Sequence, residues 1–181
     1  MDYIRNRIFL ALCLLMVSSM QTTSAQTVDR YKIQYDKKQL IGKEWCMSGN
    51  VKEPLKKRGN RTKQINAGGK QIELKAGVPL SVSLTFDTDS ISFTIICDND
   101  TATNRYAYYL SDKYDTDFNH SNVGKNIKGN IINMFGPTIS RYPLLVHNAI
   151  RIWEIKDDEI TLVILGSKKR IITLKAKLND A

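Results

Sequence analysis

Few side chains in this sequence are suited to catalysis, and they are scattered. The chain has two histidines, His120 in the polar stretch FNHSN and His147 in LLVHNAI, beside an apolar stretch. A serine nucleophile needs a strained turn and a neighbouring base, but no G-x-S-x-G motif occurs, and LGSKK (165–169) is typical of a hairpin turn. We therefore expect no catalytic residue, no enzymatic activity, and structural or surface roles for both histidines.

Metal and phosphate chemistry also lack a motif. Two isolated histidines fall short of the three or four ligands of a zinc site, and no CxxC occurs. The stretches DTDFNH and CDNDTATN are rich in oxygen donors, but they lack the spacing and closing Glu of an EF-hand loop and are typical of Asx-rich turns. NAGGK (66–70) lacks the strand–loop–helix context of a phosphate loop. We expect no metal and no cofactor.

Aromatic side chains are the remaining candidates for binding. Five of them lie in stretches predicted to be strands: Phe86, Phe93, Tyr106, Tyr108 and Trp153. Inward rings usually fill the core of a small barrel, which has room for one small ligand at most, yet barrel mouths are common ligand sites. Both roles stay open, and the candidate ligand-binding residues are Phe86, Phe93, Tyr108 and Trp153.

Strands must position these rings, because alternation with a period of two dominates the sequence. LSVSLTF (80–86) places Leu80, Val82, Leu84 and Phe86 on one face, and SISFTIIC (90–97) does the same for Ile91, Phe93, Ile95 and Cys97. Further strands are expected at 70–76, 105–110 and 125–135. Three more, at 150–156, 159–165 and 170–178, form a meander with two tight turns.

Helical periodicity is confined to Val28–Gly42, where one or two turns precede the first strand. Many short strands with local turns favour a closed barrel, since closure removes exposed edges. The sequence predicts an all-β fold, an antiparallel up-and-down barrel of roughly eight strands with a short N-terminal helix.

The first 25 residues are typical of a secretory signal peptide. Arg5 and Arg7 precede the apolar run Ile8–Val17, and Thr23-Ser24-Ala25 provides a small-residue cleavage site. The apolar run is shorter than the ~20 residues that span a bilayer. Leu10-Ala11-Leu12-Cys13 offers a lipoprotein signal as the alternative, although Leu12 stands where a small residue is required. Cleavage near Ala25 predicts export in soluble form, to the periplasm or beyond the cell.

Residues 26–181 then form a single domain of ordinary size. Cleavage of the signal peptide removes Arg5, Arg7 and Asp2, which lowers the formal charge from +9 to +8. Outside the cytoplasm the available polyanions are envelope components, so we expect no nucleic-acid partner. The densest basic stretch is Lys52–Lys70, for which solvated surface and binding site are both open.

Cys46 and Cys97 remain after cleavage, and an exported pair invites a disulfide. Alternation places Cys97 with Phe93, whereas Cys46 points away from the face of Trp45. Opposed faces rarely bring two Cβ atoms within bonding range. The pattern argues against a bridge without excluding one.

LIGKEW (40–45) places a glycine shortly before a tryptophan at the start of a strand. This arrangement resembles the opening of lipocalins and of lipocalin-like exported proteins of Bacteroidetes, with Gly-x-Trp lengthened by one residue between Gly42 and Trp45. YYLSDKYDTDFNHSNVGKNIKGN (108–130) is similar to uncharacterised secreted proteins of that group. The resemblance implies a barrel floored by Trp45, which a basic residue near the last strand, Arg170 or Lys169, covers.

Two functions follow from these patterns. The first is an exported, monomeric, non-enzymatic protein that holds a small apolar or amphipathic ligand in its barrel. The alternative is an envelope interaction module that binds an anionic macromolecule or a protein partner through Lys52–Lys70 and the loop Ser111–Lys125. A hydrolase or metalloenzyme ranks third, because the sequence lacks the motifs for either.

Overall fold

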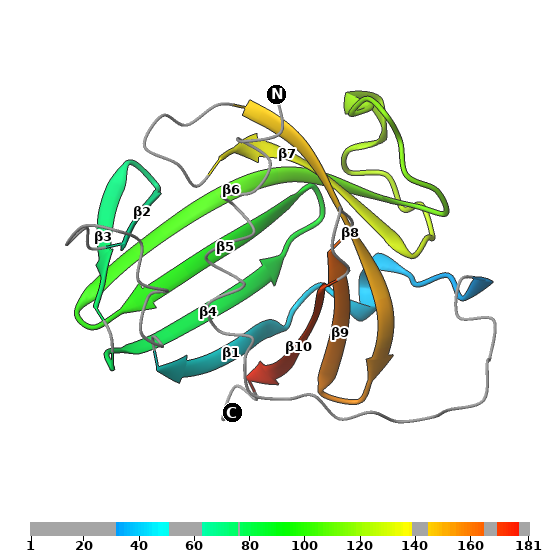
Figure 1. The fold of residues 1–181 in the computed structure, drawn as a ribbon. Coiled ribbons are helices and arrows are strands. Elements are labelled where there is room, and N and C mark those ends of the chain that lie inside the picture. Colours follow the sequence, from blue (N-terminus) through cyan, green and yellow to red (C-terminus); the bar gives the residue numbers. More distant parts are fainter. Residues whose placement is uncertain (1–31, 51–62, 76, 139–144, 165–169, 178–181) are drawn as a thin grey trace.

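Eight antiparallel strands close into a barrel (Figure 1). The computed structural model describes residues 32–50, 63–75, 77–138, 145–164 and 170–177. Around the barrel the order is β1, β4, β5, β6, β7, β8, β9, β10 and back to β1. The strands are β1 (Glu44–Asn50), β4 (Pro79–Phe86), β5 (Ser90–Cys97), β6 (Asp100–Ser111), β7 (Ile131–Pro137), β8 (Leu145–Lys156), β9 (Glu159–Ile164) and β10 (Arg170–Lys177). The expected all-β up-and-down barrel is confirmed.

Alternation along the strands fills the barrel interior. The inward positions of β4 and β5 are those predicted, because Val82 pairs with Ile95 and Leu84 with Phe93 in the antiparallel register. The predicted inward set has four residues on each strand: Leu80, Val82, Leu84 and Phe86 on β4, and Ile91, Phe93, Ile95 and Cys97 on β5. Seven of these side chains are buried, and Leu84 is partly buried. The apolar set on each strand thus lies inside, as expected for a sheet with one solvated face.

One end of the barrel is closed by the segment that precedes β1. Asp36 caps the N-terminus of the 3-10 helix η2 (Lys37–Gln39), and the side chains of Asp36 and Gln39 form a reciprocal capping box. Leu40 follows with no exposed surface, and its carbonyl accepts from Trp45 Nε1 at 3.3 Å. This turn is the described part of the expected helical lead-in, of which residues 28–31 lie outside the described chain.

A separate β-hairpin packs at the opposite end of the barrel. Its strands β2 (Lys63–Ala67) and β3 (Lys70–Leu74) form a two-stranded sheet beside the ends of β4, β5 and β6 (Figure 1). The buried side chains of Ile72 and Leu74 join a core cluster with Val82 and Ile95. The barrel therefore has one core cluster beneath this hairpin and another around Leu40 and Trp45.

Strand lengths differ from the expected ones around the long loop 112–130. Strands β6 and β8 each have 12 residues, more than predicted, whereas β7 begins at Ile131 and not at Lys125. Residues 125–130 contain only one apolar side chain, Ile127, and Gly129 pairs with Tyr35 of the N-terminal segment instead of joining the barrel. Tertiary pairing thus overrides the local pattern there.

Candidate functional site

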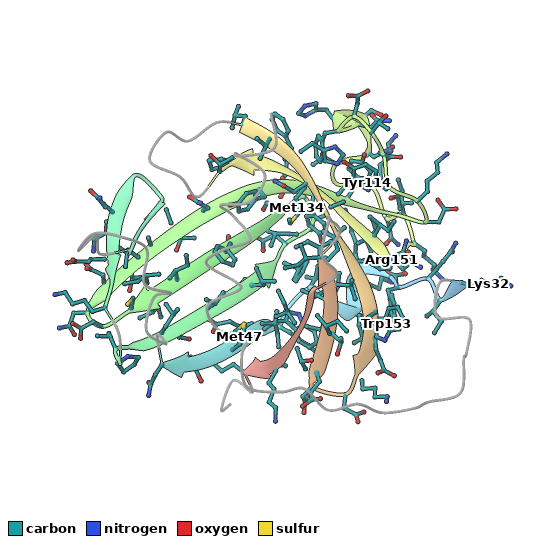
Figure 2. The ribbon with its side chains drawn as sticks, viewed as in Figure 1. Lys32, Met47, Tyr114, Met134, Arg151 and Trp153 are labelled. Carbon is teal, nitrogen blue, oxygen red and sulfur yellow. The ribbon has the colours of Figure 1, made fainter. Side chains whose placement is uncertain are left out.

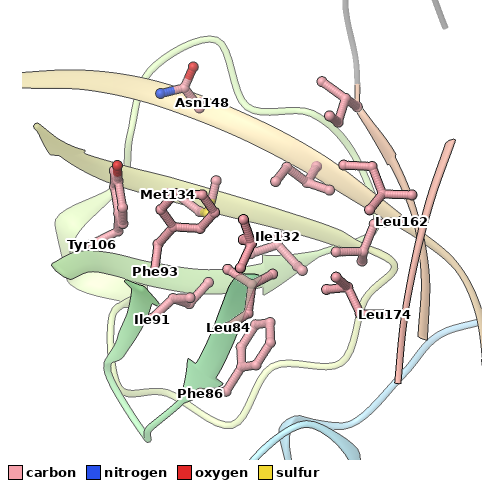
Figure 3. Close-up of a pocket in the computed structure, with 14 residues that line it drawn as sticks. Leu84, Phe86, Ile91, Phe93, Tyr106, Ile132, Met134, Asn148, Leu162 and Leu174 are labelled. Carbon is pink, nitrogen blue, oxygen red and sulfur yellow. The ribbon is translucent and has the colours of Figure 1, made fainter. Parts of the chain in front are cut away.

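A cavity lies inside the barrel, lined by side chains of its strands (Figure 3). Seven of the eight barrel strands contribute to its wall, and β1 alone does not. The lining residues are Val82, Leu84, Phe86, Ile91, Phe93, Tyr106, Ile132, Met134, Asn148, Ile150, Leu162, Ile164, Ile172 and Leu174. The cavity volume is about 50 Å³. A cavity needs roughly 10–15 Å³ to hold one water molecule, so this cavity has room for about three to five water-sized groups.

Two of the four predicted ligand-binding residues line the cavity. Phe86 at the end of β4 and Phe93 in the middle of β5 both reach it, because alternate residues of paired strands share the inner face. The cavity has an almost entirely apolar wall, as is usual for sites that take small apolar molecules.

Tyr108 lies below the cavity as part of the barrel floor. Its ring meets that of Phe86 edge-on at a centroid distance of 5.6 Å, and its hydroxyl donates to the Asp87 carbonyl at 2.8 Å. Lys37 covers the other side, with Nζ 4.7 Å from the Tyr108 centroid and 2.8 Å from the Thr88 carbonyl oxygen. Burial, with smaller effects of Asp87 and Asp89, raises the pKa of Tyr108 well above its usual value. Tyr108 is therefore a neutral structural side chain.

Trp153 is not among the cavity's lining residues. The β8–β9 register shifts between Ile152 and Glu154, so Trp153 occupies a β-bulge. Figure 2 shows it on the outer side of β8, and its carbonyl accepts from the hydroxyl of Tyr35 at 3.4 Å. Alternation with the inward Ile150 and Ile152 places Trp153 on the outer face, and the bulge shifts the next inward position to Ile155.

Tyr106 was one of the five strand aromatics considered for binding but not one of the four selected residues, and sequence patterns assigned Asn148 no role; both line the cavity. Tyr106 shares the inner face of β6 with Tyr108, so its alternation was a usable signal. Asn148 lies two residues before Ile150, where the strand was expected to begin, and β8 in fact starts at Leu145. Its pairing with Met134 places it on the inner face.

The Tyr106 hydroxyl is linked to the hairpin through Asn104. The amide Nδ2 of Asn104 donates to Tyr106 Oη at 3.3 Å, and its Oδ1 accepts from the backbone N–H of Gly68 at 2.6 Å. Asn104 is only 4% exposed, so both bonds form in a dry environment where each is strengthened. The hairpin tip and the cavity wall thus share one hydrogen-bonded chain.

Known proteins add no assignment to this geometry. Comparisons with protein-family models, curated proteins and solved structures find no match. The function must therefore be inferred from the cavity and from the surfaces around it.

Trp45 is fully buried at the barrel floor, and Lys43 covers it. The Lys43 Nζ lies 5.1 Å from the Trp45 ring centroid and 3.1 Å from the carbonyl oxygen of Asp157. Trp45 pairs with Ala176, whereas the backbone of Arg170 pairs with Ile164 at the far end of β10. Six residues of strand separate the two positions, or about 20 Å. The side chain of Arg170, and all of Lys169, lie outside the described residues.

Both histidines belong to an aromatic cluster on the outer face of β6, β7 and β8. The Phe118 ring lies at its centre, 4.9 Å from His120 and 5.7 Å from His147 between centroids. His147 also stacks on Tyr114 at 5.6 Å and shares a hydrogen bond with Asn133 at 3.1 Å. These contacts hold the loop 112–130 against the wall. In the described part of the chain, no group of three or more His, Cys, Asp or Glu is placed to hold a metal.

Cys46 and Cys97 are both free thiols. Cys97 faces the core with the Glu73 carbonyl oxygen 3.9 Å from its sulfur, whereas Cys46 lies on the opposite face of the sheet from Trp45. Burial raises the pKa of each thiol, with smaller effects of neighbouring acids. Because the thiolate is the reactive form, neither thiol is primed for chemistry.

Most of the basic segment Lys52–Lys70 lies outside the described residues. Lys70 forms an ion pair with Asp100 at 2.7 Å, so this lysine already has a counter-charge. No helix in the described part of the chain is long and apolar enough to cross a membrane.

Proposed function

We propose that this chain is an exported, monomeric and non-enzymatic binding protein that holds a small apolar or amphipathic molecule in a lipocalin-like barrel. The observation that supports the proposal is the axial cavity, whose wall comes from seven strands and is almost wholly apolar. Removal of apolar surface from water drives such binding, at about 25 cal/mol per Å². The small volume limits the ligand, or the buried part of it, to a few heavy atoms.

The proposed location depends on the first 25 residues, which have the layout of a cleavable signal. Intact mass of the protein from its native host tests it. A mature chain that begins at Gln26 supports export in soluble form, whereas a diacylated Cys13 would contradict it and favour attachment to a membrane.

Native mass spectrometry of the same preparation tests the binding function. We expect a small molecule that dissociates from the protein on mild activation. Leu84 lines the cavity, so Leu84→Trp should fill it and abolish the adduct. Ile96 on the outer face of β5 is 42% exposed, and Ile96→Trp is the matched control that should retain the adduct. An adduct that survives Leu84→Trp would place the ligand outside the barrel.

A further inference from the structure

The surface that the cavity offers to a ligand is almost entirely apolar. Tyr106 and Asn148 are among the lining residues, but their polar atoms contribute almost none of that surface. The Tyr106 hydroxyl accepts from Nδ2 of Asn104, which is not a lining residue. A buried water is usually held by about three hydrogen bonds to polar groups. The described wall therefore favours a hydrocarbon group over water.

The volume of the cavity limits the size of such a group. An apolar cavity of about 150 Å³ holds benzene, a ring of six carbons. The cavity in this barrel has about 50 Å³, which is one third of that volume. It therefore has room for about two carbon atoms.

Two lining residues are placed to set this limit. Four of the fourteen are partly exposed although they face inward: Leu84, Met134, Asn148 and Ile150. Of these, only Leu84 and Met134 pack against both core clusters, the one beneath the hairpin and the one around Trp45. Each of the ten buried lining residues belongs to a single cluster. Leu84 of β4 and Met134 of β7 thus lie where the two clusters meet.

We infer that the buried part of the ligand is a hydrocarbon group of about two carbon atoms, and that Leu84 and Met134 set this size limit. The inference rests on the proposed binding function and specifies the class of ligand for the same cavity. A hydroxyl, carboxylate or ammonium group of equal size is disfavoured, because it would lose its hydration against a wall with almost no polar surface. A free small hydrocarbon and the end of an alkyl chain share the favoured chemistry.

Three small probes test this selection. Ethane matches the expected size, methanol has as many heavy atoms as ethane but carries a hydroxyl, and benzene is too large. Binding is followed by the methyl NMR signals of Ile132 and Leu162, which line the cavity. The methyl groups of Ile96 and Ile171, which are 42% and 52% exposed, report non-specific effects. We expect ethane to shift the cavity signals saturably, methanol to bind at least about tenfold more weakly, and benzene to leave them unchanged.

Two variants test the residues that set the size limit. Leu84→Ala and Met134→Ala each shorten a lining side chain, and both should enlarge the cavity enough to admit benzene. Two positions are compared because the surrounding side chains can partly collapse into a new space. Ile96→Ala on the outer face of β5 is the matched control and should bind ethane but not benzene, as the parent chain does. Dispersed methyl signals verify that each variant is folded.

A longer alkane separates the two sources of the hydrocarbon group. Shifts of the cavity signals by n-hexane would show that the end of an alkyl chain enters while the rest lies beyond the cavity. Shifts by ethane without shifts by n-hexane would identify a free small hydrocarbon as the ligand. Either result agrees with the inferred chemistry.

The remaining outcomes separate the inference from the function it rests on. If no hydrocarbon probe perturbs the cavity signals of the parent chain, the proposed binding function is wrong. If benzene binds the parent chain, or methanol binds as tightly as ethane, only the inferred class of ligand is wrong. Absence of benzene binding in both folded alanine variants would overturn the roles of Leu84 and Met134.

Discussion

The rings of Phe86 and Tyr108 meet edge to face, with centroids 5.6 Å apart and planes at 74°, and the pair joins the cavity wall to the barrel floor. Phe86 lines the cavity, whereas Tyr108 is packed against Lys37 and contributes nothing to the wall. Edge-to-face geometry is a favoured arrangement for aromatic pairs. Two rings on the same inner face therefore have different roles, one in the site and one in the structure beneath it.

The Phe86→Ala substitution should lower the free energy of unfolding by about 3–5 kcal/mol, the usual cost of removing a buried ring. Phe86 is 1% exposed, so the loss includes both burial and packing against Tyr108. Denaturant unfolding measures it, and Phe86→Leu, which keeps much of the volume, should cost less. A loss below about 1 kcal/mol would show that the floor collapses around the missing ring.

Trp45 and Lys43 should differ strongly in their effects on stability. Trp45→Ala removes a fully buried ring and should cost about 3–5 kcal/mol. Lys43→Ala removes a cation above that ring and should cost about 0.5–1 kcal/mol. Thermal or denaturant unfolding of both variants, with exposed Lys38→Ala as the control, checks the order. Equal effects of the two substitutions would contradict the floor role of Trp45.

The barrel could be predicted because one rule, alternation with a period of two, covers most of its strands. Leu84 and Phe93 were placed correctly on the inner face by that rule alone. The rule does not predict the bulge after Ile152, which shifts the next inward position to Ile155, or the start of β7 at Ile131, because Gly129 pairs with the N-terminal segment. Both departures come from tertiary pairing, which a local pattern does not contain.

The site was less predictable than the fold. Being aromatic and on a strand was not sufficient, since Tyr108 and Trp153 meet that criterion but do not line the cavity. The position of Asn148 could be assigned only from the strand register, in which it pairs with Met134 of β7. The basic residue that covers the Trp45 ring is Lys43, two residues before it. No sequence motif distinguished Lys43 from the other basic residues.

Ionisation of Tyr109 should lower the free energy of unfolding at high pH. Burial, followed by the hydrogen bond to Asp115 at 2.6 Å, raises the pKa of Tyr109 from its ordinary value of 10.0 to about 12. The folded chain thus keeps a proton that the unfolded chain loses, so the contribution is complete below pH 10 and is lost as pH rises toward 12. Tyr106 and Tyr108 act in the same direction, because burial raises their pKa values too.

The Tyr109→Phe variant isolates this contribution. The free energy of unfolding, measured from pH 9 to 12 by denaturant titration, should fall less steeply in the variant than in the parent chain. Tyr114→Phe, in which the altered side chain is 43% exposed, is the control. A variant whose slope matches the parent's would show that Tyr109 ionises equally in the folded and unfolded chains.

The β2–β3 hairpin should detach when an alanine replaces the first of the two glycines at its tip. Gly68 and Gly69 both have positive φ, at 56° and 75°, so alanine is strained at either position by about 1–2 kcal/mol. They differ in their surroundings, because a Cβ at Gly68 would lie 2.5 Å from the Thr103 carbonyl oxygen whereas Gly69 has open space. Gly68→Ala should therefore cost about 1–3 kcal/mol more stability than Gly69→Ala.

Hydrogen exchange should show this extra loss of stability as faster exchange at the amides of β2 and β3. Equal loss in the two variants would mean that the hairpin tip does not rest on β6.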